Sequence, residues 1–244
     1  MLNLLHKLST VQTITCIHSI MNVLFANGSS TSKNPNSVRA TCVSLMCEIA
    51  KSRKRFREKL LEFAFVNIVD LDFRIRCQCA LLMSLSCDRN KPKQCQHVQL
   101  LLSELLDDSE ARVRHVALSC LLELHHRSVV LDVSFYPKII NCLKDVSEQV
   151  RNQAISLTWI LSALHRDHNL NSSNNSASEN QLLLINDGFS KLCSAVTDSS
   201  IQVRAKVGNF SYYFWSSRNG FNWKQQLHSQ LITFLLFEFS VLKC

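Results

Sequence analysis

The stretch that decides the fold is residues 96–127, QHVQLLLSELLDDSEARVRHVALSCLLELHHR. After its acidic turn, apolar residues recur at the spacing of one helical face: Val113, Val116, Ala117, Cys120, Leu121 and Leu124. Before the turn, a second apolar stripe follows the same period: Val98, Leu101, Leu102 and Leu105. Two amphipathic segments joined by a short polar turn predict a pair of antiparallel helices.

The same unit recurs along the chain. It is marked by an Asp and, six residues later, an Arg that is directly preceded by a Val or an Ile. The arginines are Arg39, Arg76, Arg114, Arg151 and Arg204. The aspartates in register are Asp70, Asp108, Asp145 and Asp198, whereas the first repeat has Lys33 at this position. A single helix pair cannot bury both of its faces, so successive pairs stack on one another. The sequence therefore predicts an all-α fold, an α-solenoid of HEAT-type helix pairs (an alpha-alpha superhelix).

The repeat also predicts the helices and the domain organisation. The first helix of each pair is expected at about 57–69, 96–106, 134–144 and 181–196. The second helix is expected at about 37–50, 73–86, 110–126 and 148–165. The expected organisation is an N-terminal helix and polar linker (1–36), the solenoid (37–207) with a flexible Asn/Ser-rich insert (166–180), and a divergent tail (208–244). The last repeat is expected to break down at Gly208, which falls where its second helix should continue, and the tail after it fits no repeat column. The chain is therefore interpreted as a fragment or variant terminus of a longer solenoid.

The repeated Asp and Arg have an expected structural role. A carboxylate at a helix start suits the free backbone N–H groups and the positive end of the helix dipole. The Arg is expected to reach the Asp of a neighbouring repeat, which would give a ladder of ion pairs that fixes the stacking register. These residues are therefore predicted to be structural.

Composition narrows the function classes. The 244 residues carry 27 Lys and Arg against 19 Asp and Glu, a mild basic bias that suits contact with nucleic acid or simply a solvated surface. Eleven cysteines lack the spacing of a disulfide framework, so they are expected as small buried side chains in a reducing compartment. The apolar residues among the first 26 are interrupted too often for a signal peptide or a membrane span, so no membrane partner is expected.

Catalytic, cofactor and metal sites are not predicted. The four glycines are isolated from one another, so the chain has no phosphate-binding loop, and neither a nucleophile elbow nor an HExxH helix is present. Cys77, Cys79, Cys87 and Cys95 lie close together but match no standard zinc spacing. No catalytic residue, cofactor ligand or metal ligand is therefore assigned.

A basic run occupies the turn between the second helix of one pair and the first helix of the next: Lys51, Arg53, Lys54, Arg55, Arg57 and Lys59. This run is a candidate nucleic-acid or nuclear-import patch, and the alternative is an ordinary solvated turn. Arg89, Lys91 and Lys93 occupy the same turn one repeat later, so the two clusters are expected to adjoin on one edge.

Three consecutive runs carry a family resemblance: LLSELLDDSEARVRHVALSCLLELHHR, YPKIINCLKDVSEQVRNQAISLTWILSALHRD and INDGFSKLCSAVTDSSIQVRAKV. Their order resembles the HEAT-repeat region of the Integrator complex subunit 4 family over roughly residues 96–207. The resemblance implies a non-catalytic scaffold in the nucleus that binds other Integrator subunits, including the metallo-β-lactamase-type endonuclease pair. That complex processes small nuclear RNA 3′ ends and attenuates transcription, so RNA contact is a further implied possibility.

Other functions fit the same repeat pattern. A helical-repeat module that binds RNA or DNA directly would lose affinity steeply with salt through the basic run. A HEAT scaffold of another complex, such as a transport receptor or a phosphatase scaffold, would differ only in the partner that it retrieves. An enzyme with an unrecognised site would need polar residues converging in one cleft.

Overall fold

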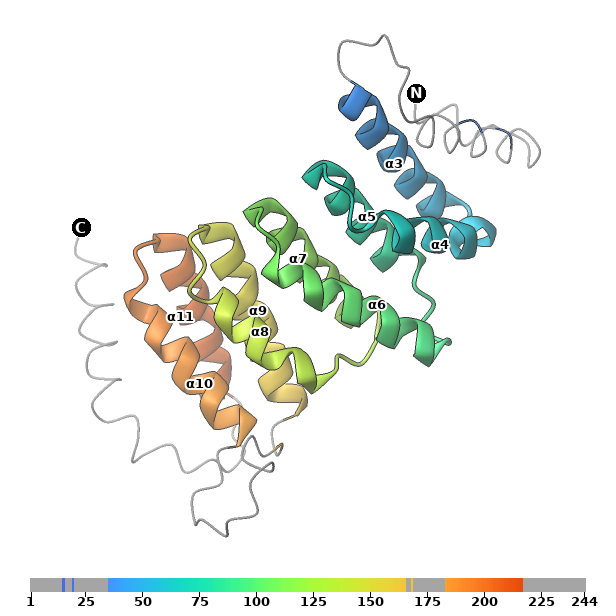
Figure 1. Cartoon of the computed structure of the whole chain (residues 1–244). Helices are drawn as coiled ribbons and strands as arrows, with labels where there is room; N and C mark the ends of the chain where they lie inside the picture. The colour runs from blue at the N-terminus through green and yellow to red at the C-terminus, as the bar shows by residue number, and fades with distance from the viewer. Residues whose placement is uncertain (1–14, 16–18, 20–34, 166–167, 169–182, 217–244) are drawn as a thin grey trace, which may run out of the picture. The chain divides into compact units, whose positions relative to one another are not determined.

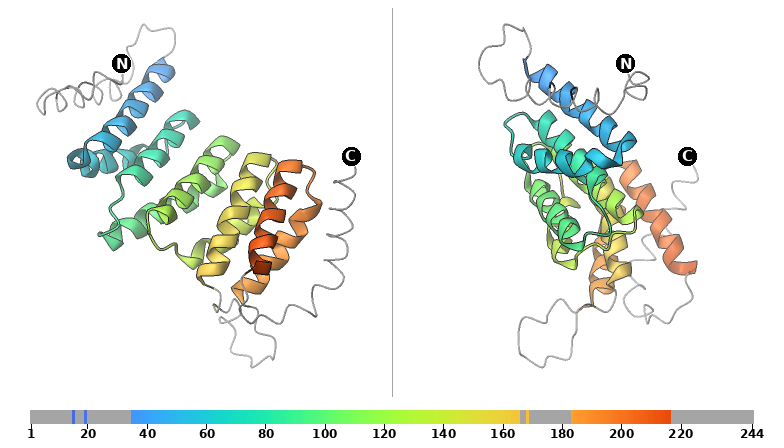
Figure 2. Two further views of the ribbon diagram at one scale, coloured as in Figure 1. Left: turned by 180° about the vertical axis from the view of Figure 1, so that it is seen from behind. Right: turned by 90° about the vertical axis from the view of Figure 1, so that its right-hand side faces the viewer.

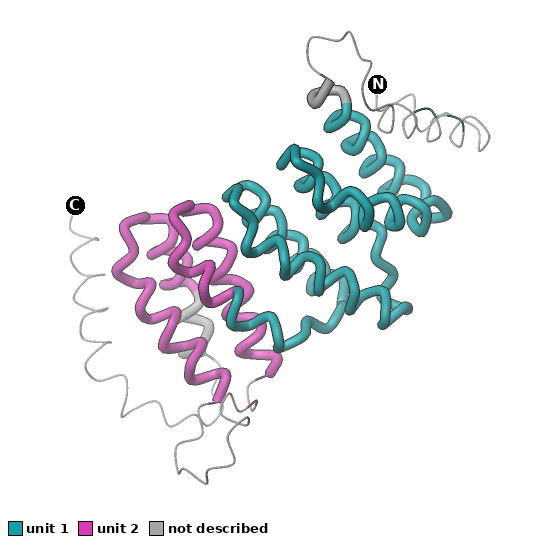
Figure 3. Tube along the Cα trace, in the orientation of Figure 1, with its two compact units in different colours: residues 1–138 teal, residues 139–244 magenta. Residues whose placement is uncertain are grey.

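The computed structural model describes residues 35–165 and 183–216, together with Thr15, Ser19 and His168. These residues form helices and turns with no β-strand, and none of their helices is both long and apolar enough to cross a membrane. The chain divides into two compact units, residues 1–138 and 139–244 (Figure 3). Each unit is a stack of helix pairs, so the predicted all-α, α-solenoid class is confirmed.

Unit 1 contains five longer helices among its described residues (Figure 1). They are α3 (Pro35–Ser52), α4 (Arg57–Asn67), α5 (Phe73–Ser86), α6 (Pro92–Glu104) and α7 (Ala111–His126). Short 3-10 turns η1 (Lys54–Phe56), η2 (Leu105–Asp107) and η3 (Val133–Phe135) join them, and α8 (Tyr136–Cys142) starts at the end of the unit. Helix α5 packs between α3 and α7, while α4 packs on α5 and α6 on α7.

Unit 2 contains α9 (Glu148–Leu164), α10 (Leu184–Ser194), the 3-10 turn η4 (Ala195–Thr197) and α11 (Ile201–Ser216). Helix α9 packs against both α10 and α11, and the views in Figure 2 show the three side by side. Their core is formed by Ile155, Leu192, Val203 and Val207, with Trp159 half-buried against it.

The repeat columns lie in the cores of the two units. The residue before each repeat Arg is buried wherever its side chain is described, namely at Ile75, Val113, Val150 and Val203. The position four residues further on is buried in every repeat, and it holds Cys42, Cys79, Ala117, Ala154 and Val207. Small side chains at this column let neighbouring helices approach closely, which explains why the column tolerates Cys and Ala but no large residue.

Several helix ends differ from the sequence-based expectation. Helix α6 begins at Pro92 rather than 96, because a proline at the first helical position lacks only an N–H that has no partner there anyway. Helix α8 is shorter than expected, since η3 replaces its first turn and Asp132 accepts a hydrogen bond from Ser134 N at 2.8 Å.

The helix break predicted at Gly208 is wrong, because α11 continues through this glycine to Ser216. A single glycine costs only about 1 kcal/mol relative to alanine inside a helix, which does not end it. The start of the predicted tail therefore belongs to α11, and its remainder from residue 217 lies outside the described residues. The predicted insert also lies outside them apart from His168, as does the N-terminal segment apart from Thr15, Ser19 and the first residues of α3.

Candidate functional site

The turns within the helix pairs share one hydrogen-bond pattern, seen first around Asp108 in unit 1. The backbone N–H of Asp108 donates to Leu105 O at 3.3 Å, and its Oδ1 accepts from Glu110 N at 2.9 Å. Arg114, six residues later, donates from Nη1 to Asp108 O at 2.7 Å and to Ser109 O at 3.0 Å. The arginine thus closes its own turn through backbone carbonyls.

The carboxylates of Asp70, Asp108 and Asp198 also accept from the arginine of the preceding repeat. In unit 1, Arg76 Nε and Nη2 donate to the two oxygens of Asp108 at 2.7 and 2.8 Å, and Arg39 forms an ion pair with Asp70. The planar guanidinium has five donors in a fixed fork, so Arg76 can hold its own turn through Nη1 and the next turn through Nε and Nη2. Lysine could not form this bridge.

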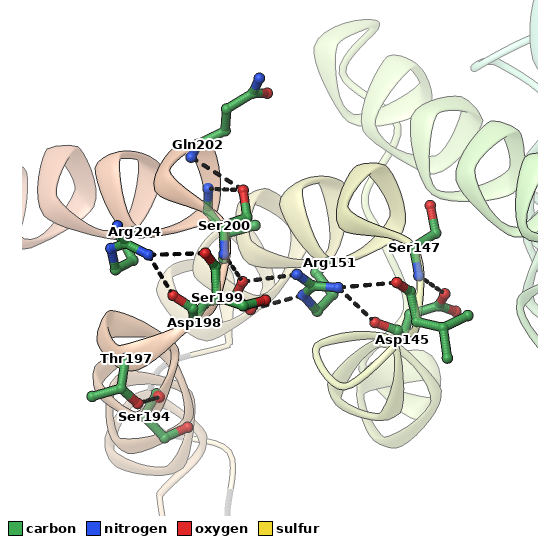
Figure 4. A network of polar contacts seen from close by, with 12 residues as sticks. Asp145, Ser147, Arg151, Ser194, Thr197, Asp198, Ser199, Ser200, Gln202 and Arg204 are labelled. Atoms are coloured by element: carbon green, nitrogen blue, oxygen red, sulfur yellow. Dashed lines mark hydrogen bonds and ion pairs between the residues drawn. The ribbon is translucent and has the colours of Figure 1, made fainter.

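Unit 2 repeats the arrangement (Figure 4). Arg151 donates to the two oxygens of Asp198 at 2.7 and 2.8 Å and closes its own turn through Asp145 O at 2.9 Å. Arg204 closes the last turn through Asp198 O at 2.6 Å and Ser199 O at 3.1 Å.

The role predicted for the repeated Asp needs a correction. The structure places Asp70, Asp108 and Asp145 two residues before the N-cap of the following helix, and each carboxylate accepts from the N–H of the N-cap residue itself. This is an Asx turn, which forms because the short Asp side chain reaches the amide two residues on. The Asp therefore shapes the turn that leads into the helix and does not cap its first turn.

The Arg76–Asp108 and Arg151–Asp198 ion pairs shift the pKa values of both of their partners. The hydrogen bond from Arg151 lowers the pKa of Asp198 although burial opposes it, and Asp198 in turn raises the pKa of Arg151. Burial raises the pKa of Asp108, but the hydrogen bonds from Arg76 and from Glu110 N outweigh it, so the net shift is downward. The carboxylates are thus held in their charged form well below neutral pH.

The connections between successive helix pairs of unit 1 form a different site, which we call the basic cleft. It lies where α3 and α5 end and α4 and α6 begin, and its volume is about 760 Å³. Its lining residues are Lys54, Arg55, Arg57, Glu58, Ser86, Cys87, Asp88, Arg89, Asn90, Lys91, Gln94 and Arg127. The predicted meeting of the two basic clusters on one edge is therefore observed for most of their members.

Two arginines of the basic cleft are held by backbone carbonyls at helix C-termini. Arg57 Nε donates to Ala50 O at 2.8 Å, near the end of α3. Arg127 donates from Nη2 to Cys87 O at 2.7 Å and from Nη1 to Ser84 O, near the end of α5. Burial lowers the pKa of Arg57, and the positive charge of Arg127 in the same lining lowers it further.

Arg127 owes its position to the way in which α7 ends. Ser128 has a positive φ of 63°, and the N–H groups of Ser128 and Val129 donate to His125 O and Leu124 O at 2.8 and 3.0 Å. This is a Schellman motif with serine at the position that usually holds glycine. The motif turns the chain sharply after Arg127 and so places this side chain at the end of α5.

The six residues of the predicted basic patch are divided by the structure. Lys54, Arg55 and Arg57 line the basic cleft, whereas Lys51, Arg53 and Lys59 do not. Lys51 instead pairs with Glu48 of its own helix at 2.8 Å. The role of this patch in binding stays a prediction.

Sequence reasoning did not find Ser86 and Arg127 as members of this site. Arg127 lies 40 residues from Cys87, to which it donates, and no local pattern links the two. The only available signal was a basic residue directly after the last turn of a helix, where cations suit the dipole.

The cysteines near the basic cleft show no arrangement for a metal. Burial raises the pKa of Cys77 to about 11 and of Cys87 to about 12, so both thiols are protonated at neutral pH. Cys87 and Cys95 lie side by side, with their sulfur atoms 3.3 Å apart. Within the described ranges, no three His, Cys, Asp or Glu side chains gather as ligands for an ion.

Comparison with known proteins places these features in a family. Residues 74–201, slightly more than half of the chain, match the model of Cnd1, the non-SMC mitotic condensation complex subunit 1. The chain belongs to the Cnd1 family. The matched span begins in α5 and ends at the start of α11, so it covers the turns around Asp108, Asp145 and Asp198.

Relatives of this Cnd1-family chain include Integrator complex subunit 4 of Xenopus laevis, 29% identical over 158 residues, which are 62% of the chain and 16% of that protein. The Integrator complex subunit 4 homolog of Dictyostelium discoideum is 28% identical over an aligned length of 217 residues. The match covers 84% of this chain and 17% of that protein. The predicted resemblance to this subunit family is confirmed, and the match spans about a sixth of the relatives' length.

A crystal structure of an engineered protein has a similar fold, with a TM-score of 0.52 at 11% sequence identity. The match covers 78% of this chain and 76% of the engineered chain. The Cnd1 family and the subunit 4 relatives together support a helical scaffold.

Proposed function

We propose that this chain is a non-catalytic scaffold segment that holds partner proteins within an Integrator-type complex in the nucleus. The observation that carries the proposal is the similarity to Integrator complex subunit 4, which extends over 84% of the chain in the Dictyostelium relative. The region of similarity is thus most of the chain rather than one motif.

The geometry supports a scaffold for a physical reason. Arg39 and Arg76 join adjacent repeats of unit 1 through carboxylates, and Arg151 does so in unit 2, so that neighbouring helix pairs are held in a fixed register. A fixed register keeps the side chains on the helix surfaces and turns at constant spacing, so a partner binds without a large loss of conformational entropy.

The proposed partners are other Integrator subunits, in particular the metallo-β-lactamase-type endonuclease pair. Through that pair the chain would take part in small nuclear RNA 3′-end processing and in transcription attenuation. The support is the family resemblance of the three consecutive repeats, and no catalytic role is assigned to this chain.

The test is direct binding of the tagged, full 244-residue chain to the purified endonuclease pair, measured by co-elution in size-exclusion chromatography. We expect a stable complex that survives 0.3 M salt. A control variant, Lys51→Gln with Lys59→Gln, lacks two surface charges and should bind the pair as well as the unaltered chain does. That result would exclude attachment through surface charge alone. A correctly folded chain that elutes apart from the pair would overturn the proposed partner.

A second candidate function, direct binding of RNA, is favoured by the cationic lining of the basic cleft. Nucleic-acid affinity would then fall steeply with salt, with a slope of roughly −0.7 per phosphate contact on a single strand. A flat salt dependence would argue against this candidate.

A further inference from the structure

The basic cleft holds more positive charge than its own residues neutralise. Six cationic and two anionic side chains line it. Its one ion pair in the described part of the chain joins Lys91 Nζ to Glu58 at 2.8 Å and so links α4 to the start of α6. Lys54 and Arg89 are exposed and have no carboxylate partner among the described residues.

The arginines at the cleft keep donors available. Both Arg57 and Arg127 are satisfied on one side by backbone carbonyls, which are neutral groups and leave the net charges in place. Neither Nη group of Arg57 makes a hydrogen bond to any described residue, so an incoming anion would find two parallel N–H donors there.

A buried hydroxyl provides independent evidence for a ligand. Ser86 lines the cleft with only 3% of its surface exposed, and its Oγ has no hydrogen-bond partner in the described structure. An unpaired buried hydroxyl is costly because it has lost its hydrogen bonds to water, so such groups usually have a partner. An acceptor bound in the cleft would remove this cost.

We propose that the basic cleft binds an acidic segment of a partner protein, with a Glu or Asp carboxylate accepting hydrogen bonds from Arg57 and Ser86. Neighbouring carboxylates of the same segment pair with Lys54 and Arg89 at the rim. This proposal rests on the proposed scaffold function, because it specifies the chemistry of one partner contact.

Three features favour a carboxylate-bearing peptide over a nucleic acid. The lining contains no aromatic side chain on which a base could stack, and Phe56 beside it is buried. Glu58 and Asp88 lie among the cations, where they would repel a backbone with one negative charge per nucleotide, whereas a peptide can place its charges between them. A volume of about 760 Å³ suits a few peptide residues rather than a long strand.

The experiment measures binding of the full chain to a fluorescent twelve-residue peptide of alternating Glu and Ser, by anisotropy at 0.1 M salt. The peptide with Gln in place of Glu and a twelve-nucleotide uridine RNA are the comparison ligands. We expect the Glu peptide to bind at least about tenfold more tightly than the Gln peptide, whose neutral amides cannot accept charge-assisted hydrogen bonds. We expect it also to bind more tightly than the RNA, whose bases find no aromatic side chain in the lining on which to stack.

Two variants and one control locate the site. Ser86→Ala should weaken peptide binding several-fold while leaving the melting temperature unchanged or higher, because the hydroxyl has no partner among the residues that the structure describes. Lys54→Gln with Arg89→Gln should weaken binding about tenfold or more. The control, Lys51→Gln with Lys59→Gln, removes the same charge from the same edge outside the cleft lining and should change affinity less than about twofold.

Equal losses in the control and the cleft variants would overturn the proposal, as would tighter binding of the RNA that depends on Lys54 and Arg89. No peptide binding by the folded chain would do the same. This assay does not contain the endonuclease pair, so its result is independent of co-elution with that pair. Either proposal can therefore fail while the other holds.

Discussion

The two ends of the helix pairs in unit 1 use arginine in opposite ways. At the turns within pairs, Arg76 meets a carboxylate, Asp108, and the side chains of this pair are only 14% and 9% exposed. At the connections between pairs, Arg57 and Arg127 donate to backbone carbonyls and to no carboxylate of the described residues, and the exposed Lys54 and Arg89 lie beside them. At the first end the positive charge of the arginine is neutralised by a carboxylate, whereas the second end keeps a surplus of positive charge.

This difference distinguishes structural cations from those available to a partner. A guanidinium that is neutralised inside the fold stabilises the register of the repeats and has little left to offer a ligand. A guanidinium that caps a helix C-terminus is held in place equally well, yet it keeps its full charge. The partner of each arginine, rather than the number of arginines, therefore indicates its role.

The largest expected effect tests whether packing or the ion pairs set the register. Ala117→Trp inserts a large ring at a fully buried position of α7 and should destabilise unit 1 by about 3 kcal/mol, at the upper end of typical overpacking costs. Urea unfolding gives the free energy. If the double variant with Arg76→Ala loses less than the sum of the single changes, the packing of α7 and the Arg76–Asp108 pair are coupled. An unchanged free energy of unfolding would contradict the assignment of the buried face.

The second prediction compares the two ends directly. Arg76→Ala leaves the largely buried Asp108 carboxylate without its guanidinium and should cost about 1.5–3 kcal/mol of unfolding free energy. The matched change Arg89→Ala at the cleft removes the same side chain where it has no carboxylate partner, and it should stay within about 0.5 kcal/mol of the wild type. Equal effects in urea unfolding would abolish the distinction between the ends.

The third prediction concerns acid. The pKa values of Asp108 and Asp198 are lowered in the folded chain, so their contribution to stability is present above the ordinary Asp pKa of about 3.8 and is lost as the pH falls through the lowered values. The melting temperatures of the wild type and of Asp108→Asn should therefore differ most at pH 7, and the difference should shrink as the pH falls below about 3.8 and vanish below the lowered pKa of Asp108. A difference at pH 3 as large as that at pH 7 would show that the carboxylate charge is not what stabilises the turn.

The smallest effect tests how the cleft end is held. Ser128→Gly should stabilise unit 1 by about 0.5–1 kcal/mol, because glycine adopts a positive φ without the steric cost that serine has there. A rise in melting temperature with unchanged binding of the acidic peptide would show that the Schellman motif is conformationally strained but already positions Arg127 correctly. A fall in melting temperature would indicate that the serine side chain stabilises this turn in another way.

Much of the fold follows from local sequence periodicity. The apolar columns around Val113 and Ala117 are buried as expected, because a 3.6-residue period fixes which side chains share a face of a helix. The exact helix ends were less predictable, since Pro92 starts a helix and Gly208 does not stop one. The start at Pro92 is a local effect of proline at the first helical position, whereas α11 continues because its packing against α9 outweighs a propensity cost of about 1 kcal/mol.

By itself the sequence determined the repeat, the helix pairs and the position of a basic run in one connecting turn. Only the tertiary structure decided which cations are neutralised, because Arg76 meets Asp108 across 32 residues and Arg127 meets Cys87 across 40. Stacking brings such groups together, and charge neutralisation depends on distances of a few ångströms rather than on spacing along the chain. The unpaired hydroxyl of Ser86 belongs to the same class of property, since burial and the lack of a partner exist only once the helices have packed.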